Sequence, residues 1–463
     1  MNNPDFLARS LAAVWHPCTQ MKQHETLPLV PIARGVGVWL YDFDGRPYLD
    51  AVSSWWVNLF GHCNPRINAA LKDQLDKLEH VMLAGFTHQP VVELSERLSR
   101  LTGLGHCFYG SDGASATEIA LKMSFHYWRN SGRPEKTRFV SLQNAYHGET
   151  VGALSVTDVA LFKDTYAPLL RESAQVPTPD WRYAEPGESA RDFALRCAKV
   201  LREHLEQHHR ETAAFIIEPL VQGAAGMGMY DAEYLRQARA LCDEFEVHLI
   251  ADEIAVGFGR TGTMFAWEQA FPSPQPLSRG ARGLISPLPR AGEGLGERGS
   301  TKPDFLCLSK GITGGYLPLS VVLTTDTVYQ AFYHDDTARG FLHSHSYTGN
   351  ALACRAALAT LDIFEQDGVI EANRAKAAFF HQAAVPLKAH PRVTNFRNAG
   401  MIWAFEVEDA APGFARRCFE AGLKRGLLLR PLGNTVYFMP PYVINEEEFR
   451  MLVSGTLEIL ETL

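Results

Sequence analysis

Between about residues 100 and 325 the chain alternates short apolar, β-rich runs with stretches of helical periodicity. The clearest runs are RFVSL at 138–142, AAFIIE at 213–218, VHLIAD at 247–252 and FLCLSK at 305–310. Strands that are apolar throughout are covered on both faces, as in a parallel sheet between two layers of helices. The pattern therefore predicts an α/β fold with a mostly parallel central sheet.

Three of these runs end on an ionisable residue, namely Glu218, Asp252 and Lys310. Ligands of open α/β sheets bind beyond the carboxyl ends of the strands, where these residues would lie. A buried carboxylate without a partner is costly, so Asp252 calls for a cationic partner. A buried lysine is equally costly unless its amine forms an imine with a carbonyl compound. Because pyridoxal phosphate needs a carboxylate at its pyridinium nitrogen and a lysine at its aldehyde, the pair predicts an enzyme of that cofactor.

The segment FYGSDGASATEIALKM offers a place for the cofactor's phosphate. Its glycines allow close approach of the backbone, and Ser115 with Glu118 fits a capping box at the start of a helix. Gly113 and Ala114 are the candidates whose N–H groups would bind the phosphate. A plain turn before a helix is the alternative interpretation of the same residues.

Aromatic and cationic residues mark further candidate positions. Tyr146, beyond the strand at 138–142, could stack on a flat ring, and His147 could contact the ring edge; both could also be half-buried loop residues. Arg430 has the planar fork that binds carboxylates, with a structural ion pair as the alternative. Trp55 and Trp56 are adjacent and face different directions, so we do not expect both to lie in the core.

Composition excludes several classes of partner. The net charge of −8 argues against nucleic acid or anionic lipid, and 46% hydrophobic residues are typical of globular proteins. No run of about 18 apolar residues predicts a membrane span, and the first residues lack a signal-peptide pattern. The eight cysteines are scattered singly, and we expect them to be reduced in the cytoplasm. Glu253 lies beside Asp252, but no His or Cys cluster completes a metal site, so none is expected.

The chain is long enough for at least two domains. Apolar alternation on both sides of Asp44-Gly45 predicts an antiparallel hairpin near the start, and a mixed α and β pattern follows residue 365. We therefore predict a small domain made from residues 1–52 and 366–463, and a large domain at 53–365.

One stretch, residues 273–300, departs from both patterns. It is rich in Pro, Gly, Ser and Arg, and its halves PLSRGARG and PLPRAGEGLGERG partly repeat one another. This composition predicts a disordered insertion or a surface loop, and an ordinary long loop is the alternative.

The motifs taken together resemble those of the class III, fold type I pyridoxal phosphate aminotransferases. The segments YHGET, IIEPLVQGAAGM, ADEIAVGFGRTG, LSKGITGG and HSYTGN occur here in that family's order. The resemblance covers nearly the whole chain apart from 273–300. It implies a fold type I architecture, with a large domain around the mostly parallel sheet and a smaller α+β domain.

The resemblance also implies roles for individual residues. Lys310 would form the Schiff base and move the substrate's α-proton, and Asp252 would hold the pyridinium nitrogen. The other implied cofactor contacts are Tyr146 on the ring, Gly113 and Ala114 on the phosphate, and Ser346 from a neighbouring subunit. The implied substrate contacts are Trp55, Trp56, Arg430, Ser344 and Cys18. A site shared across subunits implies a homodimer.

Three segments point to a particular group of members, namely WHPCTQM at 15–21, SSWW at 53–56 and LLRPLGNTVYFMPPY at 428–442. They resemble those of the biotin-pathway members, which move an amino group from S-adenosylmethionine to 8-amino-7-oxononanoate. Departures are Cys18, where a tyrosine is common, Glu149, where an aspartate is common, and a long interval between Asp252 and Lys310 that contains 273–300.

Alternatives stay open at this point. An ω-amino acid or diamine aminotransferase that uses pyruvate or 2-oxoglutarate is the nearest one, and Cys18 leaves it open. The Gly35-Val36-Gly37 run suggests a nicotinamide-dependent oxidoreductase, but it lies in the predicted hairpin. An inactive relative disabled by the insertion is the third alternative.

Overall fold

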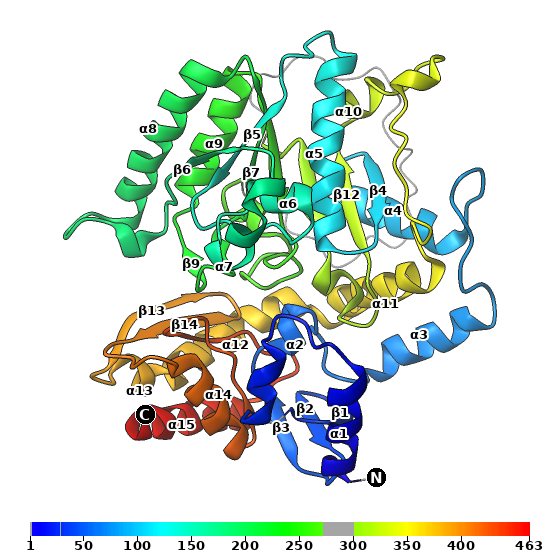
Figure 1. Ribbon diagram of the computed structural model, residues 1–463. Coiled ribbons are helices and arrows are strands. Elements are labelled where there is room, and N and C mark those ends of the chain that lie inside the picture. Colours follow the sequence, from blue (N-terminus) through cyan, green and yellow to red (C-terminus); the bar gives the residue numbers. More distant parts are fainter. Residues whose placement is uncertain (1, 28, 272–300) are drawn as a thin grey trace.

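A seven-stranded sheet forms the centre of the protein (Figure 1). The computed structural model describes residues 2–27, 29–271 and 301–463, so the predicted insertion at 273–300 lies outside the described residues. The strands lie in the order β4 (His106–Gly110), β12 (Ser320–Thr324), β11 (Phe305–Leu308), β10 (His248–Asp252), β7 (Thr212–Ile217), β5 (Arg138–Leu142) and β6 (Ala174–Val176). From β11 to β6 all neighbours are parallel, and only β12 runs antiparallel to its two neighbours. The predicted mostly parallel sheet is confirmed.

Helices cover both faces of this sheet, as the apolar runs predict. Ile250 of β10 packs in one cluster with Ile119 and Met123 of α5, whereas its neighbour Leu249 packs in the other cluster with Leu235 of α9. The helices of this region are α3 (Pro65–Leu75), α4 (Gln89–Thr102), α5 (Gly113–Asn130), α6 (Val151–Val156), α7 (Ala160–Lys163), α8 (Ala190–His208), α9 (Glu233–Glu244), α10 (Asp326–Gln330) and α11 (Ala351–Asp367). No described helix is long and apolar enough to cross a membrane.

The first and last parts of the chain form two smaller sheets, which lie below the central sheet in Figure 1. One sheet has the order β1 (Ile32–Val36), β2 (Trp39–Asp42), β3 (Pro47–Asp50) and β15 (Leu427–Leu428), and the other has β13 (Val393–Ala399), β14 (Ile402–Val407) and β16 (Thr435–Phe438). Their helices are α1 (Asn3–Ala13), α12 (Val369–Ala383), α13 (Val385–Lys388), α14 (Phe414–Lys424) and α15 (Glu446–Thr462).

The predicted hairpin is confirmed, because β2 and β3 pair antiparallel around Gly45, whose φ is +87°. A parallel pairing of β3 with β15 joins the two ends of the chain in one sheet. This pairing supports our proposal that residues 1–52 and 366–463 form one small domain beside a large domain at 53–365.

The start of α5 differs from the prediction. Asp112, not Ser115, is the N-cap, because the helix begins at Gly113 and the Asp112 carboxylate accepts a hydrogen bond from the Ser115 N–H at 2.9 Å. The predicted capping box is therefore wrong. Glu118 instead accepts hydrogen bonds from the Thr150 hydroxyl (2.6 Å) and the Gly152 N–H (2.8 Å). Both Asp and Ser are good N-caps, and the sequence alone does not choose between two so close together.

Candidate active site

The carboxyl edge of the central sheet gathers the three ionisable residues that end its strands. Asp252 is the last residue of β10, Glu218 directly follows β7, and Lys310 lies two residues beyond β11. Asp252 and Glu218 are buried, and both act electrostatically on the Lys310 amine. The predicted convergence of these groups at one edge is what the structure shows.

His147 is the direct partner of Asp252. Its Nδ1 lies 2.7 Å from Asp252 Oδ2, and both side chains are buried. The second carboxylate oxygen accepts a hydrogen bond from the Ile254 N–H at 3.1 Å. On the far side of the ring, Nε2 is buried with no hydrogen-bond partner among the described residues. The sequence had suggested His147 at the edge of a bound ring, and it did not show the contact with Asp252.

Burial sets the protonation of Lys310. The apolar surroundings lower the pKa of its amine to about 8, and the attraction of Asp252 and Glu218 only partly opposes this. The amine lies 4.5 Å from the centroid of the Trp56 ring. With a pKa near 8, roughly a tenth of the amines are neutral at pH 7, which suits a nucleophile toward aldehydes.

Glu218 is a site residue whose contacts the sequence did not predict. Its carboxylate accepts hydrogen bonds from the Tyr146 N–H at 3.0 Å and the Gly223 N–H at 3.1 Å. Burial raises the pKa of Glu218 to about 7. Its position at the end of an apolar strand was the only signal in the sequence. The carboxyl fixes the backbone beneath Tyr146, whose hydroxyl donates to Glu149 Oε1 at 2.9 Å.

The first turn of α5 has the features of a phosphate site. Asp112 takes up the N–H groups of Ser115 and Ala116 through its side chain and its carbonyl, so the N–H groups of Gly113 and Ala114 stay available. A Cβ added at Gly113 would lie 3.0 Å from Ile254, which comes two residues after Asp252. The helix N-terminus at Gly113 thus packs closely against the residue two positions after the carboxylate. The free N–H groups, the unpartnered His147 nitrogen and the Lys310 amine fit pyridoxal phosphate.

Trp55 and Trp56 occupy different environments, as the sequence predicted. Trp55 is 42% exposed, and the Arg430 guanidinium carbon lies 4.6 Å from its ring centroid. Trp56 is 5% exposed and lies next to Lys310. In the described part of the chain no carboxylate forms an ion pair with Arg430. Its guanidinium is therefore free to bind a carboxylate from outside the chain.

Cys18 lies in the same region. Partial burial and the nearby charge of Glu149 raise the pKa of its thiol, whereas Arg430 acts in the opposite direction. The thiol is consequently protonated at neutral pH and offers only a weak hydrogen-bond donor where a tyrosine hydroxyl is common in the family.

The backbone that carries the two tryptophans is a left-handed turn. Ser53, Ser54, Trp55 and Trp56 have φ values of 52°, 46°, 72° and 74°. Such a conformation costs about 1–2 kcal/mol per residue. The hydroxyl of Ser53 donates to the Met439 carbonyl and that of Ser54 to the Asp50 carboxylate, both at 2.7 Å. Side-chain hydrogen bonds thus stabilise a turn that the sequence pattern did not reveal.

Arg260 holds the end of this turn. Its fully buried guanidinium donates to the carbonyls of Trp56 (3.2 Å), Asn58 (3.0 Å) and Pro440 (2.9 Å). Because Pro440 belongs to the C-terminal part of the chain, this arginine connects the tryptophan turn with that part. Arg260 is a further residue that sequence reasoning missed.

Ser344 and Ser346 lie apart from this cluster. Both are exposed, and the carbonyl of Ser346 accepts a hydrogen bond from His80 Nε2 at 2.8 Å. No contact among the described residues joins either serine to Asp252 or Lys310. Their expected roles, on a partner's cofactor and on the substrate, stay predictions.

Comparisons with known proteins agree with this geometry. The family Aminotransferase class-III matches residues 20–276 and 288–460. An adenosylmethionine-8-amino-7-oxononanoate aminotransferase of Helicobacter pylori is 47% identical, over 99% of this chain and 98% of its own length. The crystal structure of the enzyme of that name from Methanocaldococcus jannaschii has a TM-score of 0.88 at 35% identity and covers 100% of this chain and 99% of that chain. An (S)-enantioselective omega-transaminase from Thermomicrobium roseum also has a TM-score of 0.88, at 28% identity, over 100% and 99% of the two chains.

The fold type I architecture, the residues gathered at the sheet edge and the family match agree with one another. The chain belongs to the class III aminotransferases, which depend on pyridoxal phosphate.

Proposed function

We propose that this enzyme transfers an amino group from S-adenosylmethionine to 8-amino-7-oxononanoate and so forms 7,8-diaminononanoate in biotin biosynthesis. The observation that carries the proposal is the 47% identity, over 99% of the chain, with the Helicobacter pylori relative of that name. The Trp55–Arg430 contact supports it, because it places a flat apolar wall beside a free guanidinium.

The residues at the sheet edge each have a different role in the reaction. Bound pyridoxal phosphate supplies the electron sink that makes the α-proton of the donor acidic. Asp252, held by His147, would keep a charge at the ring nitrogen, and Lys310 would accept and return the α-proton. Tyr146 would stack on the ring, and the N–H groups of Gly113 and Ala114 would hold the phosphate.

On the substrate side, Arg430 binds the carboxylate that both substrates carry, and Trp55 forms the wall above it. The Trp56 ring lies 4.5 Å from the Lys310 amine. Cys18 contacts the substrates without the hydrogen bond that a tyrosine would supply. In the two half-reactions the amino group first leaves the donor and then replaces the ketone oxygen of 8-amino-7-oxononanoate.

A homodimer is part of the proposal. Ser344 and Ser346 lie in a segment where Leu342 and Tyr347 are 80% and 65% exposed, an unusual state for large apolar side chains. A second copy that covers this segment would bury them and bring Ser346 to the neighbouring cofactor. Light scattering of the purified enzyme measures this directly, and a monomer at micromolar concentration would contradict it. All eight cysteines are free, in keeping with our expectation of a cytoplasmic location.

An ω-amino acid or diamine aminotransferase is the alternative function. The omega-transaminase from Thermomicrobium roseum and the Methanocaldococcus jannaschii enzyme have equal TM-scores to this chain, so the fold does not separate the two functions. The higher identity to the biotin-pathway relatives favours the first.

A spectroscopic test separates the two functions. The loaded enzyme is mixed with S-adenosylmethionine, lysine, alanine, glutamate or putrescine, and the absorbance of the aldehyde form of the cofactor is followed. Loss of that absorbance with S-adenosylmethionine, followed by its return on adding 8-amino-7-oxononanoate, is the expected result. A response to another donor but not to S-adenosylmethionine would transfer the assignment to the alternative.

A further inference from the structure

Trp56 is held in place by the three-stranded C-terminal sheet. Its indole Nε1 donates a hydrogen bond to the hydroxyl of Tyr437, on β16, at 3.1 Å, and the two rings meet edge to face at 6.2 Å. The same indole lies over the Lys310 amine. A shift of Trp56 would therefore change the surroundings of the reactive amine directly.

A second support for Trp56 is the segment 222–227, which comprises the last residue of β8 (Val221–Gln222) and the turn that leads to β9 (Gly228–Met229). We call it the 222–227 turn. A Cβ added at Gly223 would lie 3.0 and 3.1 Å from two ring atoms of Trp56, so the turn packs tightly against the indole. The N–H of the same glycine donates to Glu218. The position of the 222–227 turn thus limits where the indole can lie.

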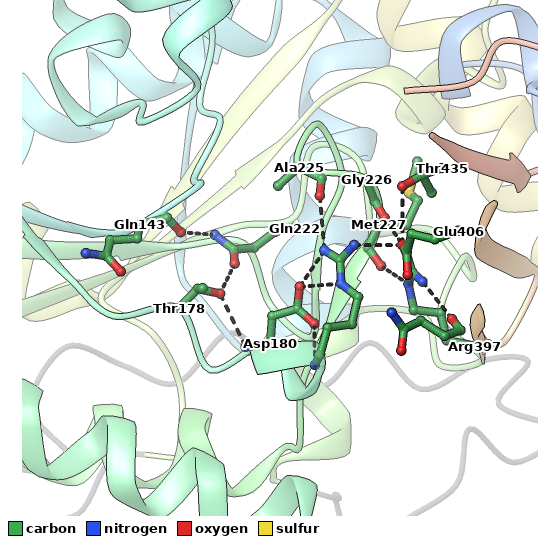
Figure 2. A network of polar contacts seen from close by, with 12 residues as sticks. Gln143, Thr178, Asp180, Gln222, Ala225, Gly226, Met227, Arg397, Glu406 and Thr435 are labelled. Atoms are coloured by element: carbon green, nitrogen blue, oxygen red, sulfur yellow. Dashed lines mark hydrogen bonds and ion pairs between the residues drawn. The ribbon is translucent and has the colours of Figure 1, made fainter. Parts of the chain in front are cut away.

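Two arginines hold this turn by its carbonyl groups. Arg397, on β13, donates from Nε to the Met227 carbonyl at 2.8 Å and from a terminal nitrogen to the Gly226 carbonyl (Figure 2). Arg182 donates to the Ala225 carbonyl at 3.1 Å. Three successive carbonyls of the 222–227 turn are therefore bound by guanidinium groups.

Glu406, on β14, joins the two arginines. Its Oε1 lies 2.7 Å from Arg397 (Figure 2) and 2.9 Å from Arg182, and Arg182 is also paired with Asp180. Arg397 is only 4% exposed. Two cations and two anions compensate one another in this buried network. Buried ion pairs add little net stability compared with apolar packing, but they fix geometry, and the 222–227 turn is the element fixed here.

We propose that Arg397 and Glu406 are positioning residues of the active site, which hold the 222–227 turn against Trp56 and so keep the indole over the Lys310 amine. The C-terminal sheet then supports Trp56 through two arms, the Tyr437 hydroxyl and this ion pair. The inference rests on the proposed role of Lys310, but it does not depend on the identity of the substrates.

The test measures the state of the Lys310 amine itself. The full-length protein, freed of cofactor, is treated with formaldehyde and cyanoborohydride at a series of pH values, and methylation of the Lys310 peptide is quantified by mass spectrometry. Only the neutral amine reacts, so the pH midpoint reports the pKa of Lys310, which burial lowers to about 8. Loosening Trp56 admits water, and Glu406→Gln and Arg397→Lys should move the midpoint upward by about one pH unit, a roughly tenfold loss of neutral amine at pH 7.

Arg239→Gln is the matched control. Arg239 is likewise a buried arginine paired with two acids, Asp243 and Asp304, but its partner Asp304 lies at the amino-terminal edge of the sheet and contacts neither Trp56 nor the turn. Its loss should lower stability without moving the midpoint. An equal shift in Arg239→Gln would overturn the proposal, because general loosening would then explain the effect.

Two further variants test the path through Trp56. In a Trp56→Ala background, Glu406→Gln should cause no additional shift, and a persisting shift would contradict the path. Tyr437→Phe keeps the ring and removes one hydrogen bond, so it should fold even where the ion-pair variants do not. An unchanged midpoint in Tyr437→Phe, or in Glu406→Gln, would refute the inference. In the loaded enzyme, Tyr437→Phe and Glu406→Gln should each lower kcat by a larger factor than they change KM.

Discussion

Replacing Arg260 by methionine should destabilise the protein more than any surface change, because three buried carbonyls lose their donor. These are the carbonyls of Trp56, Asn58 and Pro440, at 3.2, 3.0 and 2.9 Å from the guanidinium. An unsatisfied buried acceptor costs about 1–3 kcal/mol, so the three together cost about 3–9 kcal/mol. Burial lowers the pKa of Arg260, which means that desolvation of the charge opposes folding, and methionine removes this penalty. We therefore expect a loss near the lower bound, about 3–4 kcal/mol.

Urea unfolding followed by circular dichroism measures this loss, with Arg66→Met as the control. Arg66 pairs with Asp367 at 2.9 Å, but both side chains are well exposed, so the control should lose less than about 1 kcal/mol. Arg260→Lys should fall between the two, because a single ammonium group replaces the two guanidinium nitrogens that now donate to the three carbonyls. A loss below about 1 kcal/mol in Arg260→Met would refute the reasoning, since water or a shifted backbone would then satisfy the three carbonyls.

Three other outcomes follow from the site. Arg430→Lys should raise KM for the carboxylate-bearing substrates by about tenfold with little change in kcat, because the planar fork is lost; an unchanged KM in steady-state assays would remove Arg430 from the substrate site. Burial raises the pKa of Glu253 to about 8, above its unfolded value, so its contribution to stability is complete below about pH 4.5 and is lost as the pH rises to about 8. Glu253→Gln should flatten the fall in unfolding free energy between pH 5 and 8, and a slope equal to that of the parent would contradict this. Asp112→Ala should cost about 1 kcal/mol of stability and weaken cofactor binding in a fluorescence titration, whereas Asp192→Ala, which removes the hydroxyl contact near the start of α8, should leave cofactor binding unchanged.

The central sheet could be predicted because its buried strands are uninterrupted runs of apolar residues in the sequence. β7, β10 and β11 are buried at every position, and uninterrupted apolar runs of that length have few other structures open to them. Asp252 and Lys310 were identifiable for the same reason, since each is an ionisable group at the end of such a run. The cofactor followed from the chemistry of that pair, and the substrates from resemblance alone.

The contacts around these residues could not be predicted in the same way. His147 and Asp252 are separated by 105 positions, and the sequence contains no periodic signal that joins a loop residue to a strand end so far along the chain. Glu218 was visible as a strand end, but its two backbone donors lie in separate loops. The prediction of where α5 starts was wrong for a different reason, because Asp112 and Ser115 are both residue types that cap helices.

The conformation of the SSWW turn is the feature that the local sequence predicts least well. Four consecutive non-glycine residues in the left-handed region cost about 4–8 kcal/mol together, so no local preference produces this turn. The compensating contacts come from Asp50, four residues before Ser54, and from Arg260 and Met439, which lie in two distant parts of the sequence. Strain of this kind persists only where the surroundings over-determine it, and here it turns one tryptophan toward Lys310 and the other toward Arg430. The proposed wall of the substrate site is consequently a tertiary feature, and a substitution at Asp50 or Arg260 should alter substrate binding although neither need touch the substrate.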